Sequence, residues 1–506
     1  MINHTKADWR KAGLLFALLS FVALLLFYNP VPDNRQVGLM ASVAVLMAIL
    51  WITEAIPMAA TALIPTVAFP LLGIQESGQI AKAYVNSIIF LFIGGFLIAL
   101  AMERWNLHRR IALNIIYRIG RRADLLILGF MSAAAFLSMW ISNTATAVMM
   151  LPIGLAIVTK MEEEFGEHRS HQLTLALMLG IAYGCSIGGV STLVGTPANL
   201  VFVRILHESF PAMPPITFGR WLIIGLPYAF ILLLLTWFLL TRFLCRFDPK
   251  LTLDRDIIRK ELRELGPVRT EERIVLSVFI ATALLWTFRQ DLQLGFLTIP
   301  GWSGLWSGFS AVDDGTVAMT MALLLFLMPA TRDDRPGRVL EADVFRRLPW
   351  GIILLFGGGF ALAGGFVSSG LSEHIGASFK VFGSVPIVIQ VALICVLTVL
   401  LTELTSNTAT ISMLLPILIS WAVSLTVNPL VFAIPATISC SMAFMMPVAT
   451  PPNAVVFGSQ RIRIIEMLRC GVLINLVGLV LTLAAVYLLF SLVTGSPMSE
   501  FPAWAE

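Results

Sequence analysis

The sequence predicts an all-α polytopic membrane protein, built as an inverted repeat with about 11 transmembrane helices and two re-entrant hairpins. Composition supports the membrane class, because 58% of the 506 residues are apolar and only 13% are charged. Such a chain has too little polar surface to be soluble. The repeat and its inversion follow from two duplicated motifs and from the number of spans between their copies.

The spans are placed by length, since a bilayer core takes about 20 apolar residues of helix. In chain order, the candidate spans are 13–28, 37–53, 55–74, 87–103, 173–206, 220–241, 272–289, 315–330, 350–368, 430–458 and 470–493. Two further apolar stretches, 124–159 and 384–425, contain one of the duplicated motifs. Lys6, Arg10 and Lys11 precede the first span, but no small-residue cleavage site follows it. We therefore expect a retained helix and not a signal peptide.

The duplicated motif reads SNTATAVMMLPIG at 142–154 and SNTATISMLLPIL at 406–418, 264 positions apart. A second pair, IIFLFIGGF at 88–96 and IILLFGGGF at 352–360, has the same offset. Two chance matches would rarely share one offset, so the chain contains two related halves. An odd number of single spans separates the SNTAT copies. The halves therefore face opposite sides of the membrane, as in many secondary transporters.

Each SNTAT copy is expected to form the tip of a re-entrant hairpin. The apolar arms beside it are marginal in length for a full crossing, and a polar turn at membrane depth is tolerated only where it lines a cavity. A second polar break follows each tip inside an apolar span, VGTPAN at 194–199 and VATPPN at 448–453. Their prolines, Pro197, Pro451 and Pro452, interrupt the helical ladder. Such breaks free carbonyls for a cation and leave half-helix N-termini for an anion.

These four breaks form the candidate site, and none of them contains Lys, Arg, Asp or Glu. A bound anion would therefore be held by hydroxyls, amides, helix ends and a co-bound cation. Glu403 is the nearest ionisable residue, and a proton-linked role and a structural hydrogen bond are equally open for it. The glycine pairs of the second motif favour close helix packing over ligand contacts.

Other functions fit the duplication less well. Ser, Thr and Asn can join membrane helices by hydrogen bonds, but two copies of both polar elements in matched order favour a site. An intramembrane enzyme would need a buried nucleophile or a metal cluster, whereas all six histidines fall in or beside loops. A channel would seldom need an inverted duplicate of a cation and anion site. Nucleic-acid binding is excluded, because the net charge of +4 comes from cations at membrane edges. We expect a transporter.

The basic segments predict the orientation, since short cytoplasmic loops carry the excess of Lys and Arg. These segments are the N-terminus, 104–122, 242–273, 332–347 and 461–469. Placing all of them inside leaves the C-terminus outside. We expect a multi-pass protein of the plasma membrane, which in a bacterium is the inner membrane, with a cytoplasmic N-terminus.

The motifs also resemble a known family. Ser142-Asn143-Thr144 and Ser406-Asn407-Thr408, with Gly195-Thr196-Pro197 and Ala449-Thr450-Pro451, resemble the divalent anion:sodium symporters, the INDY-like di- and tricarboxylate carriers. The resemblance covers nearly the whole chain. It implies a homodimeric elevator with a scaffold of residues 1–123 and 246–383. The moving transport domain would consist of residues 124–245 and 384–506.

The resemblance also implies the ligands. The first sodium site would use Ser138, Ser142, Asn143 and the carbonyl of Gly195, and the second Thr402, Thr405, Asn407 and the carbonyl of Ala449. The substrate would contact Ser142, Asn143, Thr144, Ser406, Asn407 and Thr408, with Thr196, Thr450 and Pro451 as neighbours. Two positions depart from the family pattern. Thr405 stands where members often carry a smaller residue, although its contact is expected through the backbone, and Ala198 replaces the second proline found at Pro452.

In function, the resemblance implies sodium-coupled symport of succinate, malate or fumarate into the cell. Na⁺ would be the co-transported ion, with at least two sites, and would bind first to order the hairpin tips. A sodium-independent di- or tricarboxylate exchanger of the same fold is the alternative. Stoichiometry, and citrate or sulfate as substrates, stay open.

Overall fold

The computed structural model describes residues 2–119, 122–247, 256–293, 298–332, 335–494, 498 and 500–505. Among these residues, nine helices are long and apolar enough to cross a membrane, and five more apolar helices are shorter, at 10–17 residues. This confirms the all-α polytopic class. The two short β-hairpins described below are the exceptions within the described ranges.

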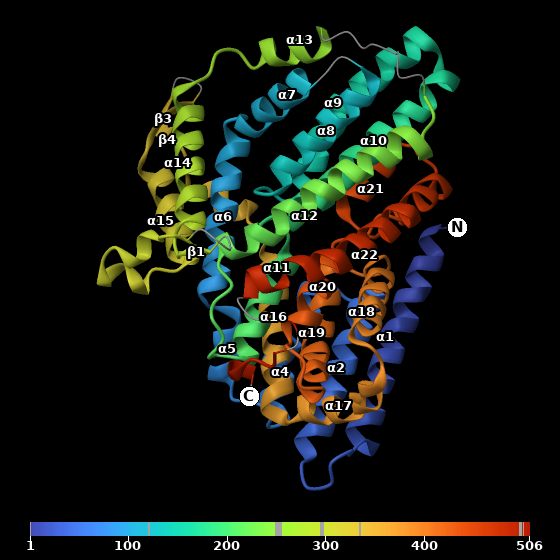
Figure 1. Cartoon of the computed structure of the whole chain (residues 1–506), viewed down its shortest axis with the longest axis vertical. Coiled ribbons are helices and arrows are strands. Elements are labelled where there is room, and N and C mark those ends of the chain that lie inside the picture. The colour runs from blue at the N-terminus through green and yellow to red at the C-terminus, as the bar shows by residue number, and fades with distance from the viewer. Residues whose placement is uncertain are drawn as a thin grey trace.

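The first helices are, in order, α1 (Ile2–Phe27), α2 (Arg35–Thr53), α3 (Met58–Thr61), α4 (Ile64–Leu71), α5 (Ser77–Tyr84), α6 (Ser87–Arg104) and α7 (Leu107–Ile119). They run from α1 at the right edge of the molecule, through α2, α4 and α5 in its lower part, to α6 and α7 at the upper left (Figure 1). The span expected at 55–74 is wrong as one helix. Pro65 lies in the first turn of α4 and has no N–H for the carbonyl of Thr61, so the helix restarts.

The first hairpin and the first broken helix follow. They comprise α8 (Ala123–Ser138), α9 (Asn143–Phe165), α10 (Glu167–Val190), α11 (Pro197–Ser209) and α12 (Phe218–Leu239), which continues as a π-helical turn (Leu240–Leu244). The arm α9 is longer than expected, because its last turns, 160–164, carry charged residues beyond the apolar stretch. Gly188 of α10 allows close packing on α8, since a β-carbon there would lie 2.2 Å from the carbonyl oxygen of Ala135.

The middle of the chain is the least regular part. It comprises α13 (Asp256–Glu264), α14 (Thr270–Thr287), β1 (Leu292–Gln293), β2 (Thr298–Ile299), α15 (Asp314–Leu327), β3 (Pro329–Arg332), β4 (Arg335–Arg338), α16 (Trp350–Ser369) and α17 (Leu371–Phe379). Strand β1 pairs antiparallel with β2 and β3 with β4, with Leu292 opposite Ile299 and Pro329 opposite Arg338. Short 3₁₀ turns lie at Trp302–Gly304, Ser307–Ala311, Ala342–Arg347, Lys380–Ser384 and Ala503–Ala505.

The second hairpin and the second broken helix complete the repeat. They are α18 (Ile387–Thr402), α19 (Asn407–Ser424), α20 (Leu430–Cys440) and α21 (Pro451–Phe457), followed by α22 (Ile464–Thr494). The basic segments expected on one side include α7 and α13, which lie at one end of the molecule, whereas α5 and α17 lie at the other (Figure 1).

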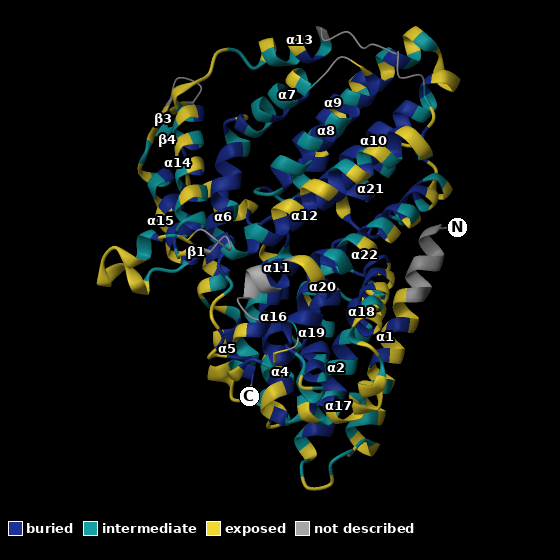
Figure 2. Cartoon of the chain, viewed as in Figure 1, coloured by how far each residue is buried: buried dark blue, intermediate teal, exposed yellow. Residues whose placement is uncertain are grey.

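Burial separates central from peripheral helices (Figure 2). In α10 the most apolar window of 18 residues is completely buried, whereas in α1 the corresponding share is 11%. Exposed apolar side chains on α1, such as Phe16 and Leu19, are at least 60% accessible. A helix that is buried all round belongs in the centre of a bundle, and exposed apolar faces suit a lipid surface.

The two halves interleave around this centre. Helices α9 and α10 of the first half pack against α21 of the second, and α11 packs against α19 and α20. Val455 of α21, for example, packs against Ala134, Ala147 and Cys185 of the first half. The hairpins and broken helices therefore form one unit and not two separate lobes.

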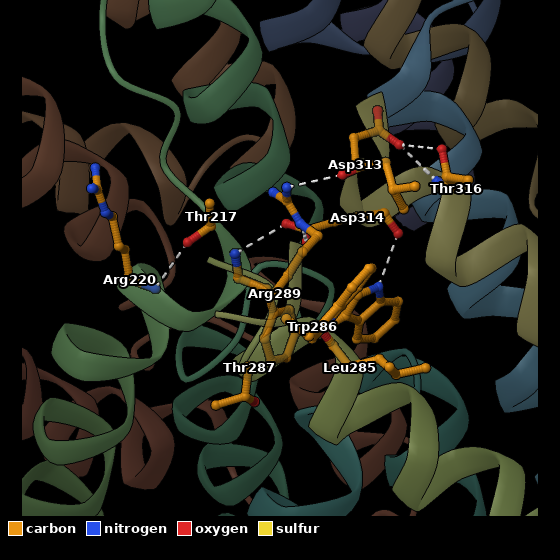
Figure 3. Close-up of polar contacts among 12 residues, drawn as sticks. Thr217, Arg220, Leu285, Trp286, Thr287, Arg289, Asp313, Asp314 and Thr316 are labelled. Carbon is orange, nitrogen blue, oxygen red and sulfur yellow. Dashed lines mark hydrogen bonds and ion pairs between the residues drawn. The ribbon is translucent and has the colours of Figure 1, made fainter. Parts of the chain in front are cut away.

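A buried polar cluster joins this unit to α14 and α15 (Figure 3). Asp314 at the start of α15 accepts hydrogen bonds from Arg289 Nε at 2.5 Å and from the backbone N–H of Phe218, the first residue of α12, at 3.1 Å. Its carbonyl accepts the indole N–H of Trp286 at 2.9 Å. Because Asp314 and Arg289 neutralise each other, this buried contact fixes the start of α12 without an unpaired charge.

Candidate functional site

Both SNTAT copies fold into helical hairpins with the same tip. Helix α8 ends at Ser138 and α9 begins at Asn143, and α18 ends at Thr402 and α19 begins at Asn407. The serine that precedes each asparagine is the N-cap of the second arm, and the hydroxyl of Ser142 accepts the N–H of Ala145 at 3.2 Å. The tips therefore expose the N-terminal ends of two helices.

The second tip gathers three oxygen atoms. Thr402 Oγ1 lies 2.7 Å from Asn407 Oδ1 and 2.7 Å from the carbonyl oxygen of Cys440 at the end of α20. A hydroxyl has one hydrogen, so it can satisfy only one of these acceptors at a time. A cluster of hydroxyl, amide and carbonyl oxygens is the ligand type that hard cations prefer.

The first tip repeats this arrangement. Ser138 Oγ lies 2.8 Å from Asn143 Oδ1. The carbonyl of Gly195 also lies close to this tip, beside Gly189 of α10. A β-carbon on Gly189 would lie 2.9 Å from Asn143 Oδ1 and 3.1 Å from the carbonyl oxygen of Gly195, so the missing side chain leaves room for both. Three of the four residues predicted for the first cation site, Ser138, Asn143 and Gly195, therefore lie together.

The two breaks lie where the sequence predicts, but their prolines act differently. The backbone leaves the helix at 191–196 and at 441–450, and α11 and α21 begin at Pro197 and Pro451. Proline is well suited to the first position of a helix, because a backbone N–H there would have no carbonyl partner within the helix. The expectation that these prolines interrupt a helix is corrected, because they start the second half of each broken helix.

Two of the remaining candidate residues cap the helices that restart after the breaks. Thr196 and Thr450 are the N-caps of α11 and α21, and Thr450 Oγ1 accepts the N–H of Asn453 at 3.4 Å. Thr196, Thr408 and Thr450 are buried, whereas Thr144 and Pro451 are exposed. No hydrogen bond that the structure describes joins Thr144, Ser406 or Pro451 to the two oxygen clusters. Helices α9, α11 and α19 each have at least 13 residues, and their N-termini favour an anion.

Thr405 does not direct its hydroxyl into the second cluster. Its Oγ1 donates to the carbonyl of Leu401 at 3.0 Å or contacts Thr410 Oγ1 at 2.5 Å. The backbone carbonyl of Thr405 therefore stays the predicted ligand atom of this residue.

Glu403 ties the second tip to the second break. Its carboxylate accepts the N–H of Met445 at 2.8 Å, the N–H of Met446 at 2.9 Å and the side-chain amide of Asn475 at 3.0 Å. Three donors stabilise a buried carboxylate. Of the two roles left open by the sequence, these contacts favour the structural one.

The first half has an equivalent tie without a charge. Thr192 Oγ1 lies 2.5 Å from the carbonyl oxygen of Met139, the position that corresponds to Glu403, and accepts the N–H of Gly195 at 3.0 Å. Each tip is therefore held to the break of its own half. Thr192, Gly189 and the carbonyl of Cys440 are absent from the predicted ligands. The signal for Gly189 is the Gly188-Gly189 pair directly before the break.

None of the residues that form the two oxygen clusters carries a charge, and the carboxylate of Glu403 beside the second tip is bound by its own three donors. No group of three or more His, Cys, Asp and Glu side chains that could hold a metal ion occurs within the described ranges. Oxygen ligands and helix N-termini remain, and they can hold a cation and an anion together.

A repeated pair of hairpins and broken helices, with uncharged oxygen clusters at the tips, is typical of a membrane transport protein. The model of the sodium:sulfate symporter transmembrane region matches residues 8–494, and the chain belongs to this family. This confirms the resemblance to the divalent anion:sodium symporters.

Curated relatives match along almost their full length. The sodium-dependent dicarboxylate transporter SdcS of Staphylococcus saprophyticus is 40% identical over 493 residues, which is 96% of this chain and 93% of the relative. The protein of the same name from Staphylococcus aureus strain MRSA252 is 39% identical over 494 residues, 96% of this chain and 92% of the relative.

Two solved structures share the fold. The YdaH transporter of Alcanivorax borkumensis has a TM-score of 0.58 at 15% identity, covering 90% of this chain and 98% of that chain. MtrF of Neisseria gonorrhoeae has a TM-score of 0.55 at 13% identity, covering 92% and 96%. At these identities the likeness concerns the fold alone.

Proposed function

We propose that the protein is a secondary active transporter that couples sodium to the uptake of C4-dicarboxylates such as succinate, malate and fumarate. The observation that carries this proposal is that Asn407 Oδ1 and the Cys440 carbonyl oxygen each lie 2.7 Å from Thr402 Oγ1, and that Ser138 Oγ and Asn143 Oδ1 repeat the hydroxyl–amide pair at 2.8 Å. Two matched oxygen clusters suit two sodium ions. The name of the staphylococcal relatives, sodium-dependent dicarboxylate transporter, supports the same substrate and ion.

The proposed sodium ligands are those that the sequence implies. They are Ser138, Ser142, Asn143 and the Gly195 carbonyl for the first site, and Thr402, Asn407 and the carbonyls of Thr405 and Ala449 for the second. The N-cap role of Ser142 is compatible, because a hydroxyl oxygen has two lone pairs and Ala145 uses one. The carbonyl of Cys440 is a further candidate ligand at the second site.

The substrate would lie between the tips. Its carboxylates would meet the Ser-Asn-Thr segments at 142–144 and 406–408, with Thr196, Thr450 and Pro451 nearby. Helix N-termini and hydroxyls supply partial charges only, so sodium provides the positive charge that a dicarboxylate needs. Coupling then follows from affinity, since each ligand binds better when the other is present. If more sodium charge than substrate charge moves, the membrane potential contributes about 2.3 kcal/mol per net charge per 100 mV.

The proposed movement is that of an elevator, with residues 124–245 and 384–506 moving against a scaffold of 1–123 and 246–383. The glycine pairs support this division. β-Carbons on Gly94 and Gly358 would lie 2.6 Å or less from Ala318 and Ala62, both within the scaffold. Gly95 instead faces Val194 of the first break, at 3.7 Å, and the side chain of Ser412 in α19 lies 2.7 Å from the β-carbon position of Gly359. In each pair, one glycine packs inside the scaffold and the next faces the moving part.

The proposal includes a plasma-membrane location, with the N-terminus and the ends of α7 and α13 in the cytoplasm and the C-terminus outside. The excess of Lys and Arg in the N-terminus and in the segments 104–122 and 242–273 supports this orientation. It also includes a homodimer, as the family resemblance implies. Light scattering of the purified protein should give twice the chain mass of 55.4 kDa, after correction for bound detergent.

Uptake of labelled succinate into proteoliposomes tests the function. An inward sodium gradient is compared with an equal potassium gradient, with and without unlabelled succinate inside. Accumulation that needs outside sodium and no internal substrate is the expected result. Uptake that ignores sodium but needs internal dicarboxylate would replace symport by exchange. Absence of uptake under all these conditions would exclude succinate as a substrate, and citrate and sulfate would be tested next.

A further inference from the structure

Two buried asparagines occupy equivalent places in the two breaks. Asn199 and Asn453 end the repeated segments 194–199 and 448–453, and both are completely buried. Neither belongs to the predicted ligands. Each lies in the first turn of the helix that restarts after its break, as the third residue of α11 or of α21.

Their side-chain amides make similar contacts in the two halves. Asn199 Nδ2 donates to the carbonyl of Thr192 at 2.8 Å and lies 3.4 Å from that of Val190 and 3.5 Å from that of Gly189. Asn453 Nδ2 donates to the carbonyls of Met446 at 3.0 Å and Ala443 at 2.9 Å. Both halves share acceptors seven and ten residues before the asparagine, and Val190 is an additional acceptor in the first half. Because all these acceptors are carbonyls, the amide nitrogen must point toward them, which fixes the amide orientation.

The carbonyl that each asparagine holds lies three residues before a proposed sodium ligand. Thr192 precedes Gly195, whose N–H donates to Thr192 Oγ1 at 3.0 Å. Met446 precedes Ala449, whose N–H donates to the carbonyl of Met446 at 3.2 Å. Residues 192–195 and 446–449 therefore each form a turn that is closed by its own hydrogen bond. In each turn the asparagine amide also binds the carbonyl of the first residue.

The amide oxygens make the placement costly. Asn199 Oδ1 and Asn453 Oδ1 are buried without a hydrogen-bond partner among the described residues. A buried acceptor without a donor destabilises a fold, and the same cost occurs at both equivalent positions. A leucine would fill nearly the same volume without that cost, so the amide donor is the feature that an asparagine adds here.

We infer that Asn199 and Asn453 are positioning residues for the two sodium sites. Each amide turns the first carbonyls of its break away from the hairpin tip, so that the carbonyl of Gly195 or Ala449 is the one presented to the ion. The inference rests on the proposed sodium coupling and adds two residues that do not contact ion or substrate themselves.

The test is sodium-dependent succinate uptake by Asn199→Leu and Asn453→Leu in proteoliposomes. We expect the sodium concentration for half-maximal uptake to rise about tenfold, the scale of one or two lost hydrogen bonds. The maximal rate at saturating sodium should stay close to that of the unchanged protein. A general loss of packing would instead lower the maximal rate and leave the sodium concentration unchanged.

Asn428→Leu is the matched control. Asn428 is also completely buried in the transport half, and its Oδ1 accepts the N–H of Leu430 at 3.1 Å at the start of α20, outside both breaks. It should not change the sodium requirement. An equal rise in Asn428→Leu, or no rise in the two test variants, overturns the inference while sodium coupling stands. Uptake by the unchanged protein that ignores sodium overturns the proposed function and the inference with it.

If a leucine variant is not recovered folded, Asn199→Ser and Asn453→Ser carry the test. Serine is smaller and keeps one donor that cannot reach both carbonyls. A rise in the sodium requirement is again expected, and an unchanged requirement overturns the inference.

Discussion

The hydroxyl oxygen of Thr402 lies 2.7 Å from Oδ1 of Asn407, across the turn of the second hairpin. The first hairpin repeats this relationship between Ser138 and Asn143 at 2.8 Å. In both hairpins the hydroxyl ends one arm and the amide begins the other, five residues later. The pairing therefore depends on the tip itself, because a change in the turn would separate the two oxygens.

The hydroxyl of Thr402 can be removed almost without a change in volume. We expect Thr402→Val to raise the sodium concentration for half-maximal uptake by about tenfold or more, because one of three converging oxygens is lost. Thr398→Val is the control on the same helix. Thr398 is equally buried, but its hydroxyl donates only to the carbonyl of Ile394, at 2.7 Å. A similar effect of both variants would argue against a cation site at the second tip.

Gly189 offers a test of the first site that should not weaken the fold. Alanine is favoured over glycine in a helix by about 1 kcal/mol, so Gly189→Ala should not destabilise α10. Its β-carbon would nevertheless press on the side chain of Asn143, at 2.9 Å, and on the carbonyl oxygen of Gly195, at 3.1 Å. We expect uptake to be largely lost while the thermal midpoint is unchanged or higher.

Gly180→Ala is the control for this variant. Its β-carbon would meet chiefly the flexible side chain of Met131, at 3.0 Å. Normal uptake by Gly189→Ala at an unchanged sodium requirement would show that Asn143 is not a ligand.

The contrast between Asn143 and Gly189 explains how far the sequence can predict this site. Repeated side-chain motifs identify the tips, because Asn143 and Asn407 act through side-chain atoms. The carbonyl of Cys440 contributes through the main chain, which any residue type has. Gly189 contributes by having no side chain, but the sequence does not show that this gap lies beside Asn143. Their role depends on where the break ends α10 and α20, and element ends are the least certain part of a sequence-based prediction.

The fold shows the same division. Long apolar segments such as α10 and α16 are predicted from composition alone. The segment at 55–74 divides into α3 and α4 because of Pro65, and α17 forms between the span expected at 350–368 and the apolar stretch at 384–425, where no span is predicted. The packing of α11 on α19 joins residues of opposite halves. Such contacts depend on the tertiary arrangement and have no local signal.

His108 predicts a dependence of stability on pH. It lies in α7, outside the candidate spans, and Nδ1 contacts the carbonyl of Met102 at 3.0 Å. Burial lowers the pKa of His108, and the neighbouring Arg109 lowers it further, although the Met102 carbonyl opposes this. The unfolded chain, with a pKa of about 6.5, therefore takes up the proton first as the pH falls. Stability is lost below about pH 6.5.

We expect the thermal midpoint of the protein to decrease as the pH is lowered from about 7.5 to about 5.5, the range in which the unfolded histidine titrates. His108→Gln, which can still donate to Met102, should show a smaller fall. An identical fall in both proteins would assign the pH dependence to other groups.

Substitution of Glu403 can distinguish a structural role of its carboxylate from a proton-coupled role. Its oxygens accept three donors, from Met445, Met446 and Asn475. In Glu403→Gln, the amide group must turn its NH₂ toward at least one of these donors, so a hydrogen bond is lost and two donors face each other. We expect a destabilisation of about 1–3 kcal/mol, measured as a lower thermal midpoint.

The pH profile of uptake decides between the two roles. A structural Glu403 predicts that Glu403→Gln has a lower thermal midpoint but the same profile as the unchanged protein below that midpoint. Asn475→Leu removes one donor and leaves the carboxylate, so it should destabilise the protein less. A stable Glu403→Gln protein whose uptake no longer responds to pH would identify Glu403 as a proton-linked group. Groups other than this carboxylate would then have to hold the second tip against its break.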